Sequence, residues 1–335
     1  MTEGDFVFGF FLKLYTNKNY QIFRLGAKHL NNVKDIRELN KSFGVIYDDF
    51  DCKDSIREKW EKNYPGINIF SVARRRNTVA MDSKISFAKK MKDSVYTPET
   101  YFNIDETNLH CLPDDNSLFF IKKNGSTGSA HVVVTKLSKL EKTSKTISNL
   151  NEYIIQKSMP NPDLYEGKRY KIRAHVILFN KNIYFHRKPW CTISKVPYDI
   201  TCDDEKILRE MNVIYQANAE KFITFDIINE NDKIEKNILL ALEDFRKNYC
   251  NEIEKVGEKE FAILGFDFVV DAEKNVNIIE INHRSNYQHP QAVSDKTDVL
   301  CIRDLYILLF TNNTKNTDLL LVTKSEPTTS VYELD

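Results

Sequence analysis

Two carboxylates and a carboxamide occur at the ends of apolar β-branched segments, where a core strand would bury them at a cost. The segment "GFDFVVDAEKNVNIIEIN", residues 265–282, predicts a β-hairpin with its turn centred near 273–274. Counting back from that turn places Asp267 directly opposite Glu280, and Asn282 follows two residues later. Like charges that face each other across a hairpin destabilise it, so a cation is expected between them. Hard oxygen ligands suit Mg²⁺ or Mn²⁺, and the alternative is ion pairing with a nearby Lys or Arg.

Strand alternation divides the hairpin into two faces. One face is expected to carry Gly265, Asp267, Val269, Asp271, Val276, Ile278, Glu280 and Asn282. The opposite face must pack on a core and is expected to carry Phe266, Phe268, Val270, Ile279 and Ile281. The candidate metal ligands therefore lie together at the end of the hairpin that is farther from the turn.

A lysine and a glycine-rich loop could bind the phosphates that usually accompany such a metal. Lys122 ends the apolar strand "LFFIK" and is followed at once by "NGSTGSA", which contains Gly125 and Gly128. A flexible loop of this kind offers backbone N–H groups to phosphate oxygens, although it lacks the P-loop pattern. A lysine at a strand end is otherwise more typical of an exposed sheet edge.

A second group of basic residues lies on one strand. In the strand predicted over 170–178, alternation puts Lys171, Arg173 and His175 on the same face. That face suits bound phosphates and a solvated sheet surface equally well.

The elements that would position these residues follow from periodicity and turn signals. Strands are expected over 6–15 and 20–25, a helix from about residue 82 with Asp82 as its N-cap, surface helices over 203–223 and 234–256, and a last helix over 297–310. The predicted domains are an N-terminal α/β domain (1–80), a central lobe (81–160), a C-terminal lobe with the metal site (161–312) and a loose tail (313–335).

Composition narrows the class of protein. The 335 residues, 41% of them apolar, suit two or three lobes around a shared cleft. Lys+Arg and Asp+Glu both number 48, and a formal net charge of zero argues against nucleic acid or a membrane surface as the partner. The six scattered cysteines indicate reduced thiols in a cytoplasmic protein, and no stretch of about 18 apolar residues is present to span a membrane.

Together these segments resemble the ATP-grasp superfamily and, most closely, the tubulin tyrosine ligase-like family. The hairpin is similar to that family's metal-binding hairpin in the spacing of its two carboxylates and its carboxamide. The segments "MDSKISFAKKMK", "FFIKKNGSTGSAHVVV" and "YIIQKSMPNPDLYEGKRYKIRAHVIL" resemble its nucleotide-binding lysine segment, its lysine with glycine loop, and its hinge with the following strand. The resemblance spans roughly residues 70–310. It implies an α+β ATP-grasp fold, in which two α+β lobes grip ATP, with a smaller N-terminal α/β domain.

The resemblance also implies an activity and site residues. The activity would be ATP-dependent ligation of a carboxylate to an amine through an acyl phosphate, such as addition of an amino acid to a protein tail. ATP would be bound by Lys84, Lys122, Gly125, Gly128, Gln156, Lys157, Met159, Arg169 and Arg173, of which Lys122 and Arg173 would also be catalytic. Mg²⁺, or Mn²⁺, would be bound by Asp267, Glu280 and Asn282.

The sequence departs from the family pattern mainly on the acceptor side. The lysine and aspartate of the family's KFDIR strand are Arg169 and Lys171 here, so Lys171 reverses a charge. The family's YREG-x-x-R motif aligns with "HRKPWCT", which keeps the first arginine as Arg187 and replaces the second with Thr192. Candidate substrate contacts are Lys171, Arg187 and Arg284.

These departures leave several functions and partners open. The acceptor can be a protein or peptide tail with an amino acid as co-substrate, as in a tubulin-modifying ligase. It can also be a different acceptor, or a small anion such as an inositol phosphate that an ATP-grasp kinase would phosphorylate. A non-catalytic nucleotide-binding module fits less well, because the acidic set is complete. The sequence leaves the acceptor, the added group and the oligomeric state open.

Overall fold

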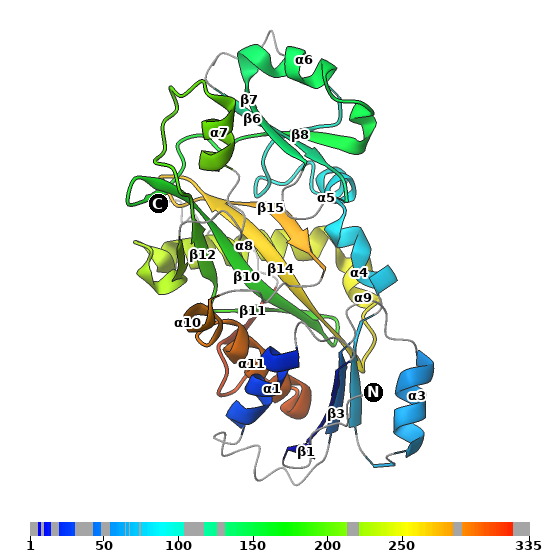
Figure 1. Ribbon diagram of the computed structural model, residues 1–335. Helices are drawn as coiled ribbons and strands as arrows, with labels where there is room; N and C mark the ends of the chain where they lie inside the picture. Colours follow the sequence, from blue (N-terminus) through cyan, green and yellow to red (C-terminus); the bar gives the residue numbers. More distant parts are fainter. Residues whose placement is uncertain are drawn as a thin grey trace, which may run out of the picture.

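The structure is a computed structural model (Figure 1). It describes residues 6–7, 10–14, 20–30, 43–47, 54–63, 65–66, 68–73, 75–103, 117–125, 131–212, 221–283 and 290–323. Gly128, Arg284 and the end of the predicted tail from residue 324 lie outside these ranges. Within them, one sheet contains twelve strands and a second sheet contains four.

The N-terminal strands belong to the larger sheet. They are β1 (Phe6–Val7), β2 (Phe10–Leu14), β3 (Phe43–Tyr47) and β4 (Asn68–Val72). Strands β2, β3 and β4 are parallel, and β4 pairs in parallel with β14 (Glu260–Val270). The segment predicted as an N-terminal domain therefore shares its sheet with the C-terminal lobe, and helix α3 (Asp54–Asn63) packs beside β4.

Residues Tyr20–His29 form helix α1, so the strand predicted over 20–25 is wrong. Phe23, Ala27 and Leu30 repeat at helical spacing and are all buried. This helical face can be recognised only when Ala27 and Leu30, which lie beyond the predicted strand, are included. Packing of this face against the core outweighs the local β-branched and aromatic character that suggested a strand.

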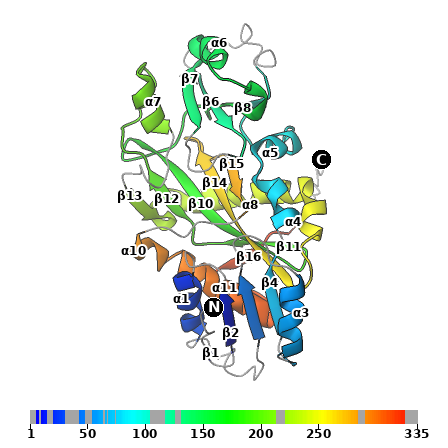
Figure 2. The same ribbon diagram turned by 45° about the vertical axis from the view of Figure 1, so that its right-hand side comes forward.

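The partner of α1 is the buried helix α11, Asp298–Thr311, which agrees with the helix expected near the end of the chain. The two helices lie side by side in the lower part of both views, beside the N-terminal strands (Figures 1 and 2). Gly26 permits this close approach, because a Cβ placed on it would lie 2.6 Å from the Cγ2 of Ile302.

The long strand β10, Lys168–Phe179, occupies the centre of the larger sheet. It pairs antiparallel with four strands: β14, β11 (Asn182–His186), β12 (Trp190–Ile193) and β9 (Leu164–Tyr165). Three further strands extend the sheet: β15 (Val276–Asn282) pairs with β14, β13 (Lys221–Thr224) pairs with β12, and β16 (Leu319–Leu321) pairs with β11. Helices α8 (Asn231–Asn248) and α9 (Cys250–Glu254) cover one face, where Phe245 packs edge-on against Phe266 at 5.0 Å between ring centroids. The opposite face of β14 packs at Phe261 and Ile263 against a second core, which contains residues of α1 and α11. The Asp267 end of that face is therefore the part that can carry a site.

The smaller sheet forms the other lobe, at the top of Figure 1. Its strands are β5 (Thr100–Tyr101), β8 (Tyr153–Lys157), β6 (Leu118–Lys123) and β7 (Val132–Lys136), in that order. Around it lie α5 (Lys84–Lys90), α6 (Leu137–Lys145), η4 (Leu150–Glu152) and α7 (Glu205–Asn212), and α4 (Arg75–Asp82) leads into it. The short elements η6 (Phe225–Ile227) and α10 (Gln291–Ser294) belong to the lobe that contains the larger sheet, which is called the lower lobe below.

Helix boundaries differ from the prediction in three places. Ser83, not Asp82, caps α5: its side chain accepts a hydrogen bond from the backbone N–H of Ser86, whereas Asp82 ends α4. The helix predicted over 203–223 is described as far as Asn212, and its last predicted residues belong instead to strand β13; residues 213–220 lie outside the described ranges. The helix predicted over 234–256 is divided at Tyr249 into α8 and α9.

The tail predicted to be loose from residue 313 contains a strand. Residues Leu319–Leu321 pair with β11, and Leu319 is buried against the second core, so the prediction is wrong for this segment. Among the described residues, no helix is both long enough and apolar enough to cross a membrane.

Candidate active site

The hairpin of β14 and β15 has the predicted register at the end that carries Asp267 and Glu280. Asp267 lies opposite Glu280, which confirms the count across the turn. The register then shifts between Asp267 and Phe268, so that Phe268 pairs with Ile278. One extra residue on β15, Ile279, accounts for this bulge.

The bulge changes which side chains face the core. Val276 and Ile278 are buried in the main core, and Ile279 lines a pocket on the opposite side. The faces predicted for these three residues are therefore wrong, because a one-residue insertion inverts alternation along the rest of the strand. The faces predicted for β14 are right: Phe266, Phe268 and Val270 pack in the core.

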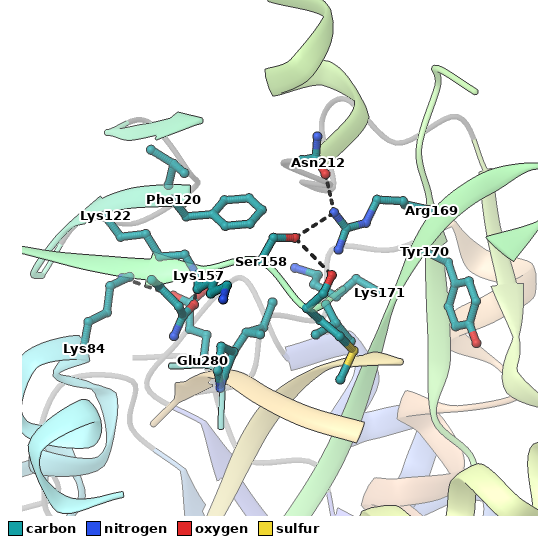
Figure 3. A pocket seen from close by; sticks show the side chains of 16 residues that line it. Lys84, Phe120, Lys122, Lys157, Ser158, Arg169, Tyr170, Lys171, Asn212 and Glu280 are labelled. Atoms are coloured by element: carbon teal, nitrogen blue, oxygen red, sulfur yellow. Dashed lines mark hydrogen bonds and ion pairs between the residues drawn. The ribbon is translucent and has the colours of Figure 1, made fainter. Parts of the chain in front are cut away.

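A pocket lies between the smaller sheet and this hairpin, and Figure 3 shows it from close by. Its lining residues are Lys84, Pro98, Phe120, Lys122, Val132, Gln156, Lys157, Ser158, Met159, Arg169, Tyr170, Lys171, Asn212, Val269, Ile279 and Glu280. The sequence-predicted residues among them come from α5, β6, β8, the segment after β8, β10 and β15. Elements distant in sequence thus converge on one pocket.

Two lysines point into this pocket from the smaller-sheet side (Figure 3). The Nζ of Lys84 lies 3.2 Å from Glu280 Oε1, and the Nζ of Lys122 donates to Gln156 Oε1 at 2.6 Å. Loss of hydration lowers the pKa of Lys122 to about 8, with Lys84 adding to the effect and Glu280 opposing it. An ammonium group held with little water is suited to binding phosphate.

Asp267 is the most tightly held carboxylate of the site. Its side chain is 1% exposed, accepts two hydrogen bonds from Arg173, and lies 2.9 Å from the Nζ of Lys171. Burial alone would raise the pKa of this carboxyl, but the charges of Arg173 and Lys171 outweigh it and lower the pKa to about 2. Asp267 is therefore ionised in the folded protein.

The basic face predicted on β10 is buried, not solvated. Besides Lys171 and Arg173, which bind Asp267, His175 is fully buried and its Nε2 lies 2.7 Å from Asp298 Oδ1. Of the two alternatives weighed for this face, the solvated sheet surface is thus wrong. Arg173 is not among the residues that line the pocket.

Residues 156–159, which are the end of β8 and the two residues after it, line the pocket. Gln156 is buried and its Nε2 donates to Thr100 Oγ1 at 3.2 Å, which fixes the amide that holds Lys122. The backbone N–H of Ser158 donates to Leu118 O at 2.7 Å. These bonds tie the segment to β5 and β6, so that Lys157 and Met159 are presented along one wall of the pocket.

Arg169 spans the pocket from β10 to α7. Its guanidinium donates to Ser158 Oγ at 3.3 Å and to the Oδ1 of Asn212 (Figure 3). Sequence reasoning missed Ser158 and Asn212. Ser158 could have been suspected from its place beside the hinge residues, whereas Asn212, at the end of a surface helix, carries no sequence signal.

Comparison with known proteins decides the family. The sequence profile described as the tubulin-tyrosine ligase family matches residues 61–305. This chain belongs to the tubulin-tyrosine ligase family. The family membership predicted from the motifs is therefore confirmed.

A curated relative and a solved structure agree with this assignment. A probable tubulin–tyrosine ligase of Schizosaccharomyces pombe is 24% identical over 155 residues, a match that covers 42% of this chain and 38% of that protein. The C-terminal domain of Pby1 from K. lactis, described as an ATP-grasp enzyme interacting with the mRNA decapping enzyme Dcp2, superimposes with a TM-score of 0.60 at 16% identity. That alignment covers 94% of this chain and 98% of the other, so the predicted ATP-grasp fold is confirmed. The family supports an ATP-dependent ligase in general.

The residues of β15 fit the divalent cation that ATP-grasp enzymes of this kind typically use. Glu280 is 30% exposed. The side-chain nitrogen of Asn282 donates to Gly265 O at 3.3 Å, which leaves its carbonyl oxygen for a cation. Asp267 fits less well, because both of its oxygens already contact cationic side chains. The predicted ligands lie close together, and their role in metal binding stays a prediction.

The predicted acceptor residues do not converge on the same pocket. Arg187 pairs with Glu235 at 2.9 Å and lines a different pocket at the edge of the lower lobe. Thr192, which aligns with the family's second arginine, is buried in β12 and donates to the carbonyl of Lys171 at 3.5 Å. Only Lys171 of the described candidates for substrate contact faces the ATP-grasp pocket.

Proposed function

We propose that this family member is an ATP-dependent carboxylate–amine ligase that works through an acyl phosphate. The observation that carries the proposal is the convergence of Lys84, Lys122, the segment 156–159 and Glu280 on one pocket between the two lobes. The adenine would lie along the segment 156–159, and the phosphates would extend toward the two lysines. Family and fold support ATP as the co-substrate.

The side chains of the pocket suit phosphoryl transfer to a carboxylate. The ammonium groups of Lys84 and Lys122 would stabilise charge on the transferred phosphoryl group. Glu280 and Asn282 would hold Mg²⁺, which neutralises phosphate charge during transfer. The substrate carboxylate oxygen attacks the γ-phosphorus and ADP leaves; an amine then attacks the acyl carbon and releases phosphate. This sequence needs no nucleophilic side chain, and the surrounding lobes would keep water from the acyl phosphate.

An acceptor other than tubulin is the second candidate. It is favoured by Thr192, which replaces a family arginine and is buried, and by Arg187, which is engaged with Glu235. Thr192 removes one positive charge of the family pattern, and Glu235 offsets that of Arg187. We therefore propose a protein or peptide tail as acceptor, with an amino acid as the added group, and leave the tail's identity to experiment.

The deciding experiment measures ADP, inorganic phosphate and product mass for the full chain with Mg²⁺ and ATP. Tubulin, peptides, free amino acids and inositol phosphates are offered singly and in pairs. A ligase releases ADP and phosphate only when a carboxylate and an amine are both present. ADP release with a phosphorylated polyol and no free phosphate would instead establish a kinase, and turnover without a joined product would contradict ligation.

A matched pair of variants ties turnover to the pocket. Glu280→Gln keeps the shape of the side chain but removes its charge, and we expect turnover to fall at least about 100-fold. Glu273→Gln makes the same change on an exposed residue in the turn of the same hairpin and should leave turnover unchanged. Undiminished turnover in Glu280→Gln would refute the role of this carboxylate.

We also propose a reducing, cytoplasmic location. The cysteines in the described part of the chain, Cys191, Cys202, Cys250 and Cys301, are free thiols, two of them buried. Imaging of the tagged full-length protein in its own cell tests this proposal.

A further inference from the structure

We propose that Lys171 is a built-in cation that takes the place of one divalent metal ion, so that the site binds its nucleotide together with a single ion held by Glu280 and Asn282. The inference rests on the proposed ATP site. It concerns how that site is charged, and it assigns Lys171 a positioning role toward the phosphates instead of an acceptor contact.

The first argument is that both oxygens of Asp267 already contact cationic side chains. Its Oδ1 accepts from Arg173 Nε, and its Oδ2 accepts from Arg173 Nη2 at 3.0 Å and lies 2.9 Å from Lys171 Nζ. The carboxylate is 1% exposed, and the register of β10 against β14 places Arg173 directly beside it. A metal ion at Asp267 would have to compete with the ammonium group of Lys171 and the guanidinium group of Arg173.

The second argument is that Lys171 reaches both Asp267 and the pocket. It lines the pocket, with 16% of its side chain exposed, while Arg173 beside it does not line the pocket. Lys171 thus contacts the buried carboxylate and also lines the pocket, where Figure 3 shows it. A metal ion that bridges a carboxylate and a phosphate would place its positive charge in the same position as this ammonium group.

The third argument concerns the charge of the whole cluster. Asp267 and Glu280 contribute two negative charges, and Lys84, Lys171 and Arg173, all in ion pairs with them, contribute three positive charges. The net charge of these groups is therefore already positive before any metal ion binds. One divalent ion can enter with the nucleotide's own phosphates, whereas a second ion at Asp267 would meet the positive charges of Lys171 and Arg173 at close range.

The sequence points the same way. Lys171 stands where the family's KFDIR strand carries its aspartate, so the charge at this position is reversed. The change is compensated locally, because Asp267 pairs with the new ammonium group. Replacing Lys171 with aspartate should therefore free Asp267 for a second metal ion.

The test counts bound Mn²⁺ by electron paramagnetic resonance of the free ion, in the presence of saturating AMP-PNP, with nucleotide occupancy measured on the same sample. The wild-type chain should bind one Mn²⁺ per AMP-PNP. Lys171→Asp should bind two, and Lys171→Arg, which keeps the cation, should again bind one. Lys168→Asp introduces the same acidic residue at the start of the same strand, outside the pocket lining, and should also bind one.

The outcomes separate this inference from the proposed function. Two Mn²⁺ on the wild-type chain, or one on a folded Lys171→Asp variant, would overturn the role of Lys171 while leaving an ATP site in place. Absence of both AMP-PNP and Mn²⁺ binding would overturn the proposed function and this inference together. Circular dichroism checks the fold of each variant, and the wild-type count decides the matter if Lys171→Asp does not fold.

Discussion

The Nζ of Lys84, at the start of α5, lies 3.2 Å from the Oε1 of Glu280, near the end of β15. This ion pair joins the smaller-sheet lobe to the hairpin across the pocket. It means that the predicted phosphate-binding lysine and the predicted metal-binding carboxylate form one electrostatic unit. A nucleotide with its divalent ion would enter between partners that already balance each other.

The first prediction follows from this pair. Lys84→Met removes a charged hydrogen-bond donor from the pocket, and because such bonds contribute about 1.5–3 kcal/mol, the Kd for AMP-PNP should rise roughly ten- to a hundredfold. Isothermal titration calorimetry with Mg²⁺ measures it. Lys89→Met, on an exposed position of the same helix, is the control and should bind as the wild-type chain does. An unchanged Kd in Lys84→Met would exclude Lys84 from the nucleotide site.

A pH dependence is expected from Lys122, whose pKa is lowered to about 8 by loss of hydration. Below pH 8 the side chain is charged and can bind phosphate; above pH 8 it is neutral in the free protein. Binding of AMP-PNP must then take up a proton, so affinity should fall as pH rises from 7 to 9.5, by up to about tenfold per pH unit above the pKa. Lys122→Arg stays charged over this range, and its affinity should vary much less. Equal profiles for the two proteins would contradict the assignment.

The hairpin shows which parts of the site could be predicted from sequence. The pairing of Asp267 with Glu280 depends only on alternation and the position of the turn, both of which are local features. The bulge was not predictable, because Ile278 and Ile279 are equally apolar and either could face the core. The core selects Ile278, and Ile279 is left to line the pocket.

Contacts between distant elements account for most of the remaining differences. The hydrogen bond from Arg169 to Asn212 joins β10 to a surface helix, and the sequence around neither residue predicts it. Leu319 pairs with β11 from a polar segment that suggested a loose tail, because β11 offers it an unpaired edge. The family motifs predicted several of the residues that line the pocket, whereas such tertiary contacts depend on the whole fold.

Asp267 should make the protein lose stability in acid. Its pKa is lowered from 3.8 to about 2 in the folded protein, chiefly because the charges of Arg173 and Lys171 outweigh burial. A depressed carboxyl pKa stabilises the fold above the unfolded pKa, and this stabilisation, about 2 kcal/mol, should be lost as pH falls from about 4 to 2. Urea unfolding of the wild-type chain and Asp267→Asn measures it. The difference in free energy of unfolding between the two should shrink over this window; a constant difference would contradict the prediction.

The contact between α1 and α11 should respond to a single methyl group. In Gly26→Ala the new Cβ would lie 2.6 Å from the Cγ2 and 2.9 Å from the Cβ of Ile302, both parts of a buried, stiff side chain. The helices must move apart, and overpacking of this kind typically costs about 1–3 kcal/mol, which exceeds the gain in helix propensity from replacing glycine. Urea unfolding monitored by circular dichroism measures the free energy of unfolding. Gly257→Ala, where the nearest atom to the new Cβ is the Glu260 side chain at 3.5 Å, is the matched control and should change stability by less than about 0.5 kcal/mol. Equal stabilities of Gly26→Ala and the wild-type chain would show that α1 does not pack on α11 at this distance.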